Sequence, residues 1–94
     1  MKIQAEFIRR KLEEIKFQRR SKYSEVNAHR VLYIRILCDI LKEATLEVER
    51  AEDTKKIEEI VSLLRDLEGE YPEAQKAILG AVELIEDKME QKIK

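Results

Sequence analysis

Residues 57–72 read IEEIVSLLRDLEGEYP, and this stretch predicts one helix, its end and the start of the next. Its apolar side chains recur every three or four residues, which places them on one face of an α-helix. Gly69 is expected at the C′ position that ends the helix, and Pro72 at the first position of the next one. The stripe consists of Ile57, Ile60, Val61, Leu64 and Leu67, with Leu63 beside it.

The helices on either side of this turn are bounded by similar signals. Asp53 or Thr54 is expected to cap the earlier helix, because their side-chain oxygens accept backbone hydrogen bonds at a helix start. The later helix begins at Pro72 and presents a face rich in alanine, which lets a neighbouring backbone approach closely. The inward residues of this helix are expected to be Ala74, Ala77, Ile78, Ala81, Val82, Ile85 and Met89.

The chain is expected to begin with a helix over residues 2–20. Ile8, Leu12 and Ile15 form its core stripe, with Ala5 beside them. A surface helix needs only one such stripe. A second apolar side therefore indicates another packed neighbour or an intermolecular contact. Its members, which are the candidate protein interface, are Ile3, Phe7 and Phe17.

Residues 21–24 predict a short break, with Ser24 as the N-cap of a second helix over residues 25–51. One continuous helix over residues 2–50 is the competing interpretation. The second helix is apolar nearly all round, so we expect it to be long, central and buried. Its main face is predicted to comprise Val26, Tyr33, Leu37, Ile40, Leu41, Ala44 and Val48, and the rest of its circumference Val31, Leu32, Ile34, Ile36 and Cys38.

Together these helices predict a single all-α domain over residues 1–94, a small antiparallel bundle of about four helices arranged as two hairpins. Cys38 is the only cysteine, which excludes an intramolecular disulfide and favours a reducing compartment. The longest apolar run, residues 31–41, contains Arg35 and Asp39 and is too short to span a bilayer. We expect a soluble, cytoplasmic protein without a membrane partner.

The charge is divided between the two halves of the chain. Residues 1–35 hold ten basic and four acidic side chains, a net charge of +6, and residues 36–94 hold nine and sixteen, a net charge of −7. The total of −1 therefore conceals a dipolar molecule. Such asymmetry suggests an anionic partner for the basic half, or association between oppositely charged surfaces.

The basic half contains a candidate site for anions or nucleic acid. Basic side chains neutralise phosphates, and the aromatic rings of Phe17 and Tyr23 lie among them and could stack on unpaired bases. Arg19 and Arg30 also fit a structural interpretation, in which they cover the end of the core. The candidate contacts are Arg9, Arg10, Lys16, Arg19, Arg20, Lys22 and Arg30.

The sequence contains no convincing catalytic, cofactor-binding or metal-binding constellation. Gly69 and Gly80 are isolated, so a glycine-rich phosphate loop is excluded. His29 and Cys38 are expected on opposite sides of one helix, where they cannot share an ion without a partner chain, and Cys38 is interpreted as an inert core residue. A group of carboxylates on the last helix is interpreted as a solvated face, with divalent-ion binding as the alternative. That group is Glu83, Glu86, Asp87 and Glu90.

Two functions remain from these observations, and neither is enzymatic. The first is an interaction or assembly module that self-associates or docks onto a partner protein through apolar residues outside its core. The second is a nucleic-acid-binding accessory protein that uses the basic half without sequence specificity. No cofactor and no small-molecule substrate are expected.

Overall fold

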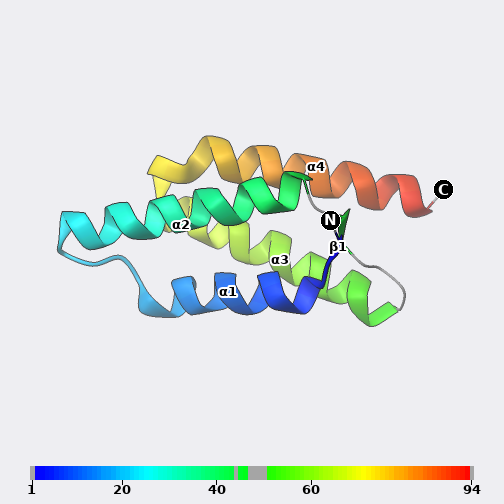
Figure 1. The fold of residues 1–94 in the computed structure, drawn as a ribbon, viewed down its shortest axis with the longest axis horizontal. Coiled ribbons are helices and arrows are strands. Elements are labelled where there is room, and N and C mark those ends of the chain that lie inside the picture. The colour runs from blue at the N-terminus through cyan, green and yellow to red at the C-terminus, as the bar shows by residue number, and fades with distance from the viewer. Residues whose placement is uncertain (1, 44, 47–50, 94) are drawn as a thin grey trace.

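The computed structural model describes residues 2–43, 45–46 and 51–93, with side chains for residues 4–43 and 53–89. These residues form four helices that lie lengthwise against one another: α1 (Ala5–Gln18), α2 (Ser24–Glu43), α3 (Ala51–Glu70) and α4 (Gln75–Ile93). Helices α1 and α3 run in one direction and α2 and α4 in the other, within 45 × 22 × 21 Å (Figure 1). The predicted all-α antiparallel bundle is confirmed.

A short parallel pairing, rather than helix, occupies the start of the chain and the segment after α2. Strand β1 (Lys2–Ile3) pairs with β2 (Thr45–Leu46), with Lys2 opposite Thr45 and Ile3 opposite Leu46. Because this pairing satisfies backbone groups that a helix would otherwise satisfy, the adjoining helices are shorter than predicted. Helix α1 begins at Ala5 instead of residue 2, and α2 ends at Glu43 instead of residue 51. Ala44 and Val48 lie outside the described residues.

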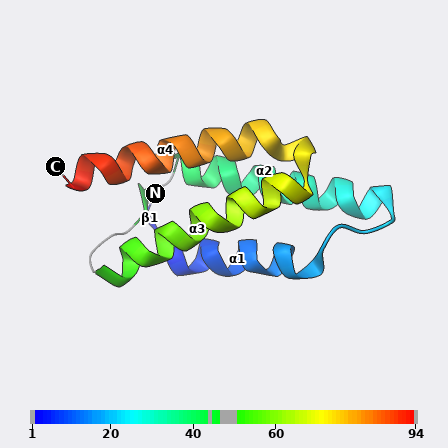
Figure 2. The same cartoon turned by 180° about the vertical axis from the view of Figure 1, so that it is seen from behind.

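The helices pack mainly in pairs that are not consecutive in the sequence. Helix α1 lies along α3, and α2 lies along α4, whereas α1 and α2 contact each other only slightly. Seen from behind, α3 runs between α1 and α4 (Figure 2). Helix α2 is long, as predicted, but at 20 residues it is no longer than α3, and α3 is the more central helix because it packs against both α1 and α4. Consecutive helices are antiparallel, as the two predicted hairpins require. The main packing, however, joins one hairpin to the other, through α1 with α3 and α2 with α4.

The core confirms the predicted faces of three helices. Ile8, Leu12 and Ile15 of α1 are buried beside Ala5. The predicted stripe of α3 and the alanine-rich face of α4 are also buried or partly buried. Burying one such large apolar side chain contributes roughly 1.5–3 kcal/mol to stability. The fully or nearly fully buried residues of α3 and α4 are Ile57, Ile60, Leu64, Leu67, Ile78, Ala81, Val82 and Ile85.

The buried face of α2 differs from the prediction. Ile34 and Cys38 are fully buried, whereas Val26 and Tyr33 are exposed. The helix is apolar almost all round, so periodicity alone could not decide which side faces the core. Leu37 and Leu41 are buried as predicted, and Asn27 is buried with them.

The connection between α3 and α4 also differs in detail. Gly69 lies inside α3, which continues to Glu70, and no described glycine has a positive φ. Pro72 opens a 3₁₀ turn, η1 (Pro72–Ala74), that leads directly into α4. Tyr71 stands between these elements as the largest fully buried side chain, and its N–H donates to Leu67 O at 2.7 Å. The sequence interpretation did not place Tyr71 in the core.

Candidate docking surface and its basic end

The turn between α1 and α2 is held by backbone and side-chain hydrogen bonds. The Ser21 N–H donates to Asn27 Oδ1 at 2.8 Å, and Asn27 Nδ2 donates back to Ser21 O at 2.7 Å. The Tyr23 N–H donates to Ser21 Oγ at 3.1 Å. Helix α2 begins at Ser24 itself, so Ser24 is not the N-cap predicted for a helix starting at residue 25. The buried Asn27 fixes the geometry of the turn instead.

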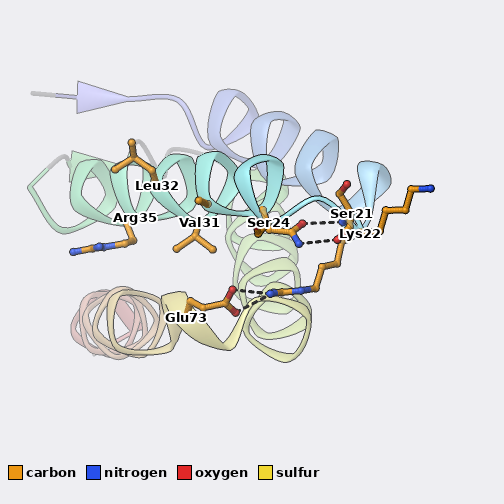
Figure 3. Close-up of a pocket in the computed structure, with 10 residues that line it drawn as sticks. Ser21, Lys22, Ser24, Val31, Leu32, Arg35 and Glu73 are labelled. Atoms are coloured by element: carbon orange, nitrogen blue, oxygen red, sulfur yellow. Dashed lines mark hydrogen bonds and ion pairs between the residues drawn. The ribbon is translucent and has the colours of Figure 1, made fainter.

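Arg20 links this turn to the connection between α3 and α4 through hydrogen bonds. Its guanidinium donates to both carboxylate oxygens of Glu73, at 2.9 and 2.8 Å, and to Glu70 O at 3.2 Å. Its backbone N–H donates to the Glu70 carboxylate. The guanidinium also lies 5.6 Å from the centre of the Tyr71 ring. Figure 3 shows Glu73 receiving the paired contact at the edge of a hollow beside α2.

The Arg30 side chain likewise forms contacts within the protein. Its guanidinium donates to the Arg19 carbonyl and lies 3.4 Å from the Tyr71 hydroxyl. Arg19 itself has a φ of 57° and an exposed side chain. The structural interpretation of Arg30, as a residue that covers the end of the core, therefore agrees with its contacts.

The basic residues of α1 face the acidic residues of α3. Lys16 Nζ lies 2.7 Å from Asp66 Oδ2, and Arg9 lies 3.6 Å from Glu59. Arg9 also pairs at 2.7 Å with both Glu6 and Glu13 on its own helix. The hydrogen bond from Arg9 lowers the pKa of Glu6, and the same bond raises the pKa of Arg9. These cations therefore contact protein carboxylates.

The three remaining candidate anion contacts, Arg10, Arg19 and Lys22, are exposed, and of these only Arg10 has an ion pair within the part of the chain that the structure describes. Arg10 lies 3.8 Å from Glu6 on its own helix. Lys22 lies 5.4 Å from the centre of the exposed Tyr23 ring. The structure gives no ion pair for the Arg19 side chain within the part of the chain that it describes.

Large apolar side chains gather on the side where α1 and α2 diverge. Phe7 is 50% exposed and Phe17 88% exposed, in agreement with their predicted place outside the core. Ile3 lies in β1, and its side chain is outside the described residues. Helix α2 adds three exposed residues: Tyr33, which was predicted on its main buried face, and Leu32 and Ile36, which were predicted on the rest of its circumference. Leu32 is 54%, Tyr33 39% and Ile36 46% exposed. Phe7, Phe17, Leu32, Tyr33 and Ile36 are named the α1–α2 face below.

This face is hollowed rather than flat. A groove of about 480 Å³ lies between the two helices, with Glu14, Ile15 and Gln18 on one wall. A second hollow of about 360 Å³ lies beside Phe17, and Glu14 and Gln18 line both this hollow and the groove, so the two are neighbours. The opposite wall of the groove is formed by His29, Arg30, Leu32, Tyr33 and Ile36.

Leu32 forms a ridge on this surface. It lines both the groove toward α1 and a third hollow of about 530 Å³ on the other side of α2. Figure 3 shows Val31 and Arg35 on the side of α2 that faces Glu73, whereas Leu32 projects from the other side of the helix. A ridge between two hollows is a shape that another surface can interlock with.

Titratable side chains outside this surface are buried or paired with other residues in several places. Burial raises the pKa of the Cys38 thiol to about 11, which keeps it protonated at neutral pH. In the carboxylate group on α4, Glu86 pairs with Arg65 at 3.1 Å, and the Glu90 side chain lies outside the described residues. No three His, Cys, Asp or Glu side chains of the described residues converge as metal ligands. None of the helices described is both long and apolar enough to cross a membrane.

No protein-family model, curated protein or solved structure matches this chain. Function is therefore inferred from the exposed side chains and the hollows that they line.

Proposed function

We propose that this chain is a non-enzymatic interaction module that assembles through the α1–α2 face, primarily with itself. The observation that carries this proposal is the exposure of five large apolar side chains on α1 and α2, four of which line two neighbouring hollows. Contiguous apolar patches of this kind mark interaction surfaces in soluble proteins. Three of the five are aromatic, the residue class that is enriched at protein interfaces.

The packing of the bundle explains why this face is available. Helix α1 buries its stripe against α3, and α2 buries its inner face mainly against α4. The exposed apolar residues of α1 and α2 are therefore left uncovered by the helices that the structure describes. Docking a second surface there removes this apolar area from water, which is the dominant favourable term in most protein association.

The test is the molar mass of the purified protein by light scattering across a range of concentrations. We expect a concentration-dependent dimer or larger species, which Phe17→Ser combined with Leu32→Ser converts to a folded monomer. Leu79→Ser is the matched control, because Leu79 is 43% exposed on α4, outside this face. A wild-type chain that remains monomeric at hundreds of micromolar would contradict self-association.

Sequence-independent nucleic-acid binding is the second candidate, and one observation favours it. Arg19 and Lys22 lie in the same turn as the 62% exposed Tyr23, so two cations flank a ring able to stack on a base. Binding to labelled single-stranded DNA or RNA at low salt, and its loss in Arg19→Glu with Lys22→Glu, would support this site. Arg9 and Lys16 are unsuitable for this test, since they pair with α3.

A further inference from the structure

Strand β1 and helix α1 form an N-terminal arm that contacts mainly elements beyond the turn to α2. Helix α1 packs along α3, and β1 pairs with β2, whereas α1 contacts α2 only slightly. The turn lies at the opposite end of α1 from β1, at one end of the bundle (Figure 1). The arm, defined as residues 2–18, is therefore attached to the rest of the chain by this one turn and buries its apolar side mainly against α3.

The turn between the arm and α2 is short and contains a residue in an unfavourable backbone conformation. Residues 19–23 connect the two helices. Arg19 has a φ of 57°, the one positive φ of a non-glycine residue in the part of the chain that the structure describes. A residue with a Cβ is strained in this conformation. Residues 19–23 contain neither glycine nor proline, so they are also compatible with one continuous helix.

We propose that the N-terminal arm exchanges between two copies of this chain, so that α1 of each copy packs on α3 of the other. Residues 19–23 then continue the helix from α1 into α2, and β1 of each copy pairs with β2 of the other. A short connection under strain favours such domain swapping. This inference goes beyond the proposed function, because it uses the core contact of α1 and not the α1–α2 face.

The closed chain and the exchanged dimer share the contacts of the arm. Lys16 lies 2.7 Å from Asp66 and Arg9 lies 3.6 Å from Glu59, and a second copy offers the same carboxylates at the same places. The buried stripe of α1 likewise meets an identical α3. The balance between the two states therefore depends on residues 19–23 and on the concentration of the chain. Exchange relieves the backbone strain and adds helical hydrogen bonds there.

Hydrogen bonds within the turn oppose the exchange. The buried Asn27 accepts from the Ser21 N–H at 2.8 Å and donates to Ser21 O at 2.7 Å. The Arg30 guanidinium donates to the Arg19 carbonyl. A continuous helix uses these same backbone groups, so these bonds break when the arm opens. The folded chain therefore stays closed, and exchange takes place when chains fold together at high concentration.

Refolding at high concentration tests the role of the turn. The chain carries Phe17→Ser and Leu32→Ser, which remove association through the α1–α2 face, and is refolded from urea. We expect a slowly dissociating dimer in size-exclusion chromatography. Arg19→Gly should lower its yield by about tenfold or more, because glycine adopts a positive φ without strain. Arg19→Ala is the matched control and should keep the yield, since it removes the same side chain and retains the strain; equal yields from the two variants would overturn the role of the strained turn.

Charge reversal across α1 and α3 tests whether each arm packs on the other copy. Lys16→Glu and Asp66→Lys chains, in the same background and distinguished by mass, are refolded together, and the dimers are quantified by native mass spectrometry. A mixed dimer with exchanged arms has opposite charges at both α1–α3 contacts, whereas each homodimer has like charges there. We expect mixed dimers well above the proportion that random pairing gives, because like charges in contact are unfavourable.

The outcomes separate this inference from the proposed function. A random proportion of mixed dimers, or no dimer after refolding, would overturn arm exchange. Either result would leave the proposed function intact, since that function is tested on wild-type chain that has not been denatured. Arm exchange after refolding, in a chain whose wild type is monomeric without denaturation, would overturn the proposed function and support this inference.

Discussion

The guanidinium of Arg20 donates two parallel hydrogen bonds to Glu73, across more than fifty residues of sequence, at 2.9 and 2.8 Å. This contact joins the α1–α2 turn to the start of the α3–α4 corner. Paired contacts of this kind are geometrically specific as well as favourable. The pairing therefore helps to hold α2, and with it the α1–α2 face, in a fixed position relative to α4.

Removing the Glu73 charge should destabilise the bundle in a pH-dependent way. The bond from Arg20 lowers the pKa of Glu73 below its ordinary 4.5, so the folded state favours the carboxylate. Its contribution is present above the unfolded pKa and is lost as the pH falls through the lowered folded pKa. Glu73→Gln should reduce the melting temperature at pH 7, and the difference from wild type should shrink as the pH is lowered below 4.5. Glu83→Gln, on the exposed side of α4, is the control; an equal effect of both variants would contradict the role of Arg20.

Tyr71 should be a principal determinant of stability. It is fully buried at the corner between α3 and α4, so Tyr71→Ala removes a large core side chain and should cost about 3–5 kcal/mol in the free energy of unfolding. Tyr71→Phe keeps the ring and loses only the 3.4 Å contact with Arg30, which should cost about 0.5–1 kcal/mol. Urea denaturation followed by circular dichroism measures both values. Similar values for the two variants would contradict a core role for the ring.

Phe7 and Phe17 should be dispensable for folding. Both side chains are at least half exposed, so changing both to Ser should leave the helical content and the melting temperature nearly unchanged. If they border the assembly surface, the same variant should form a smaller species in size-exclusion chromatography. Loss of helicity would place the rings in the core, contrary to the structure.

The Cys38 thiol should be unreactive in the folded protein. Its pKa is raised to about 11 by burial, so the thiolate fraction at pH 8 is about 100-fold lower than for an ordinary thiol with a pKa of 9.0. Labelling with an aromatic disulfide reagent at pH 8 should be slow in buffer and rapid in denaturant. Equal rates in the two conditions would show that α2 does not bury this residue.

Helix α1 shows what can be predicted from a single apolar stripe. Ile8, Leu12 and Ile15 are its only residues at that spacing, so periodicity identified the buried side correctly, and it also placed Phe7 and Phe17 outside the core. Helix α2 has several apolar stripes, so periodicity alone did not identify its buried side. Its register was settled by tertiary packing and by the buried Asn27, so Leu32 and Ile36 could not be recognised as surface residues.

Contacts between residues far apart in the sequence explain the remaining differences between the predicted and the observed structure. The sequence indicated a basic surface on α1, but the contacts of Lys16 with Asp66 and of Arg20 with Glu73 depend on which helices become neighbours. That information is absent from the periodicity of either helix alone. Tyr71 was overlooked for a similar reason, because it lies between Gly69 and Pro72 in a segment typical of a turn.

The molar mass of the wild-type chain as a function of concentration, measured beside the Phe17→Ser/Leu32→Ser variant, tests the central claim most directly. We expect a reversible dimer or larger species for the wild type, and a folded monomer for the variant. A wild-type chain that remains monomeric at every concentration, or a variant that associates as well as the wild type, would contradict assembly through the α1–α2 face.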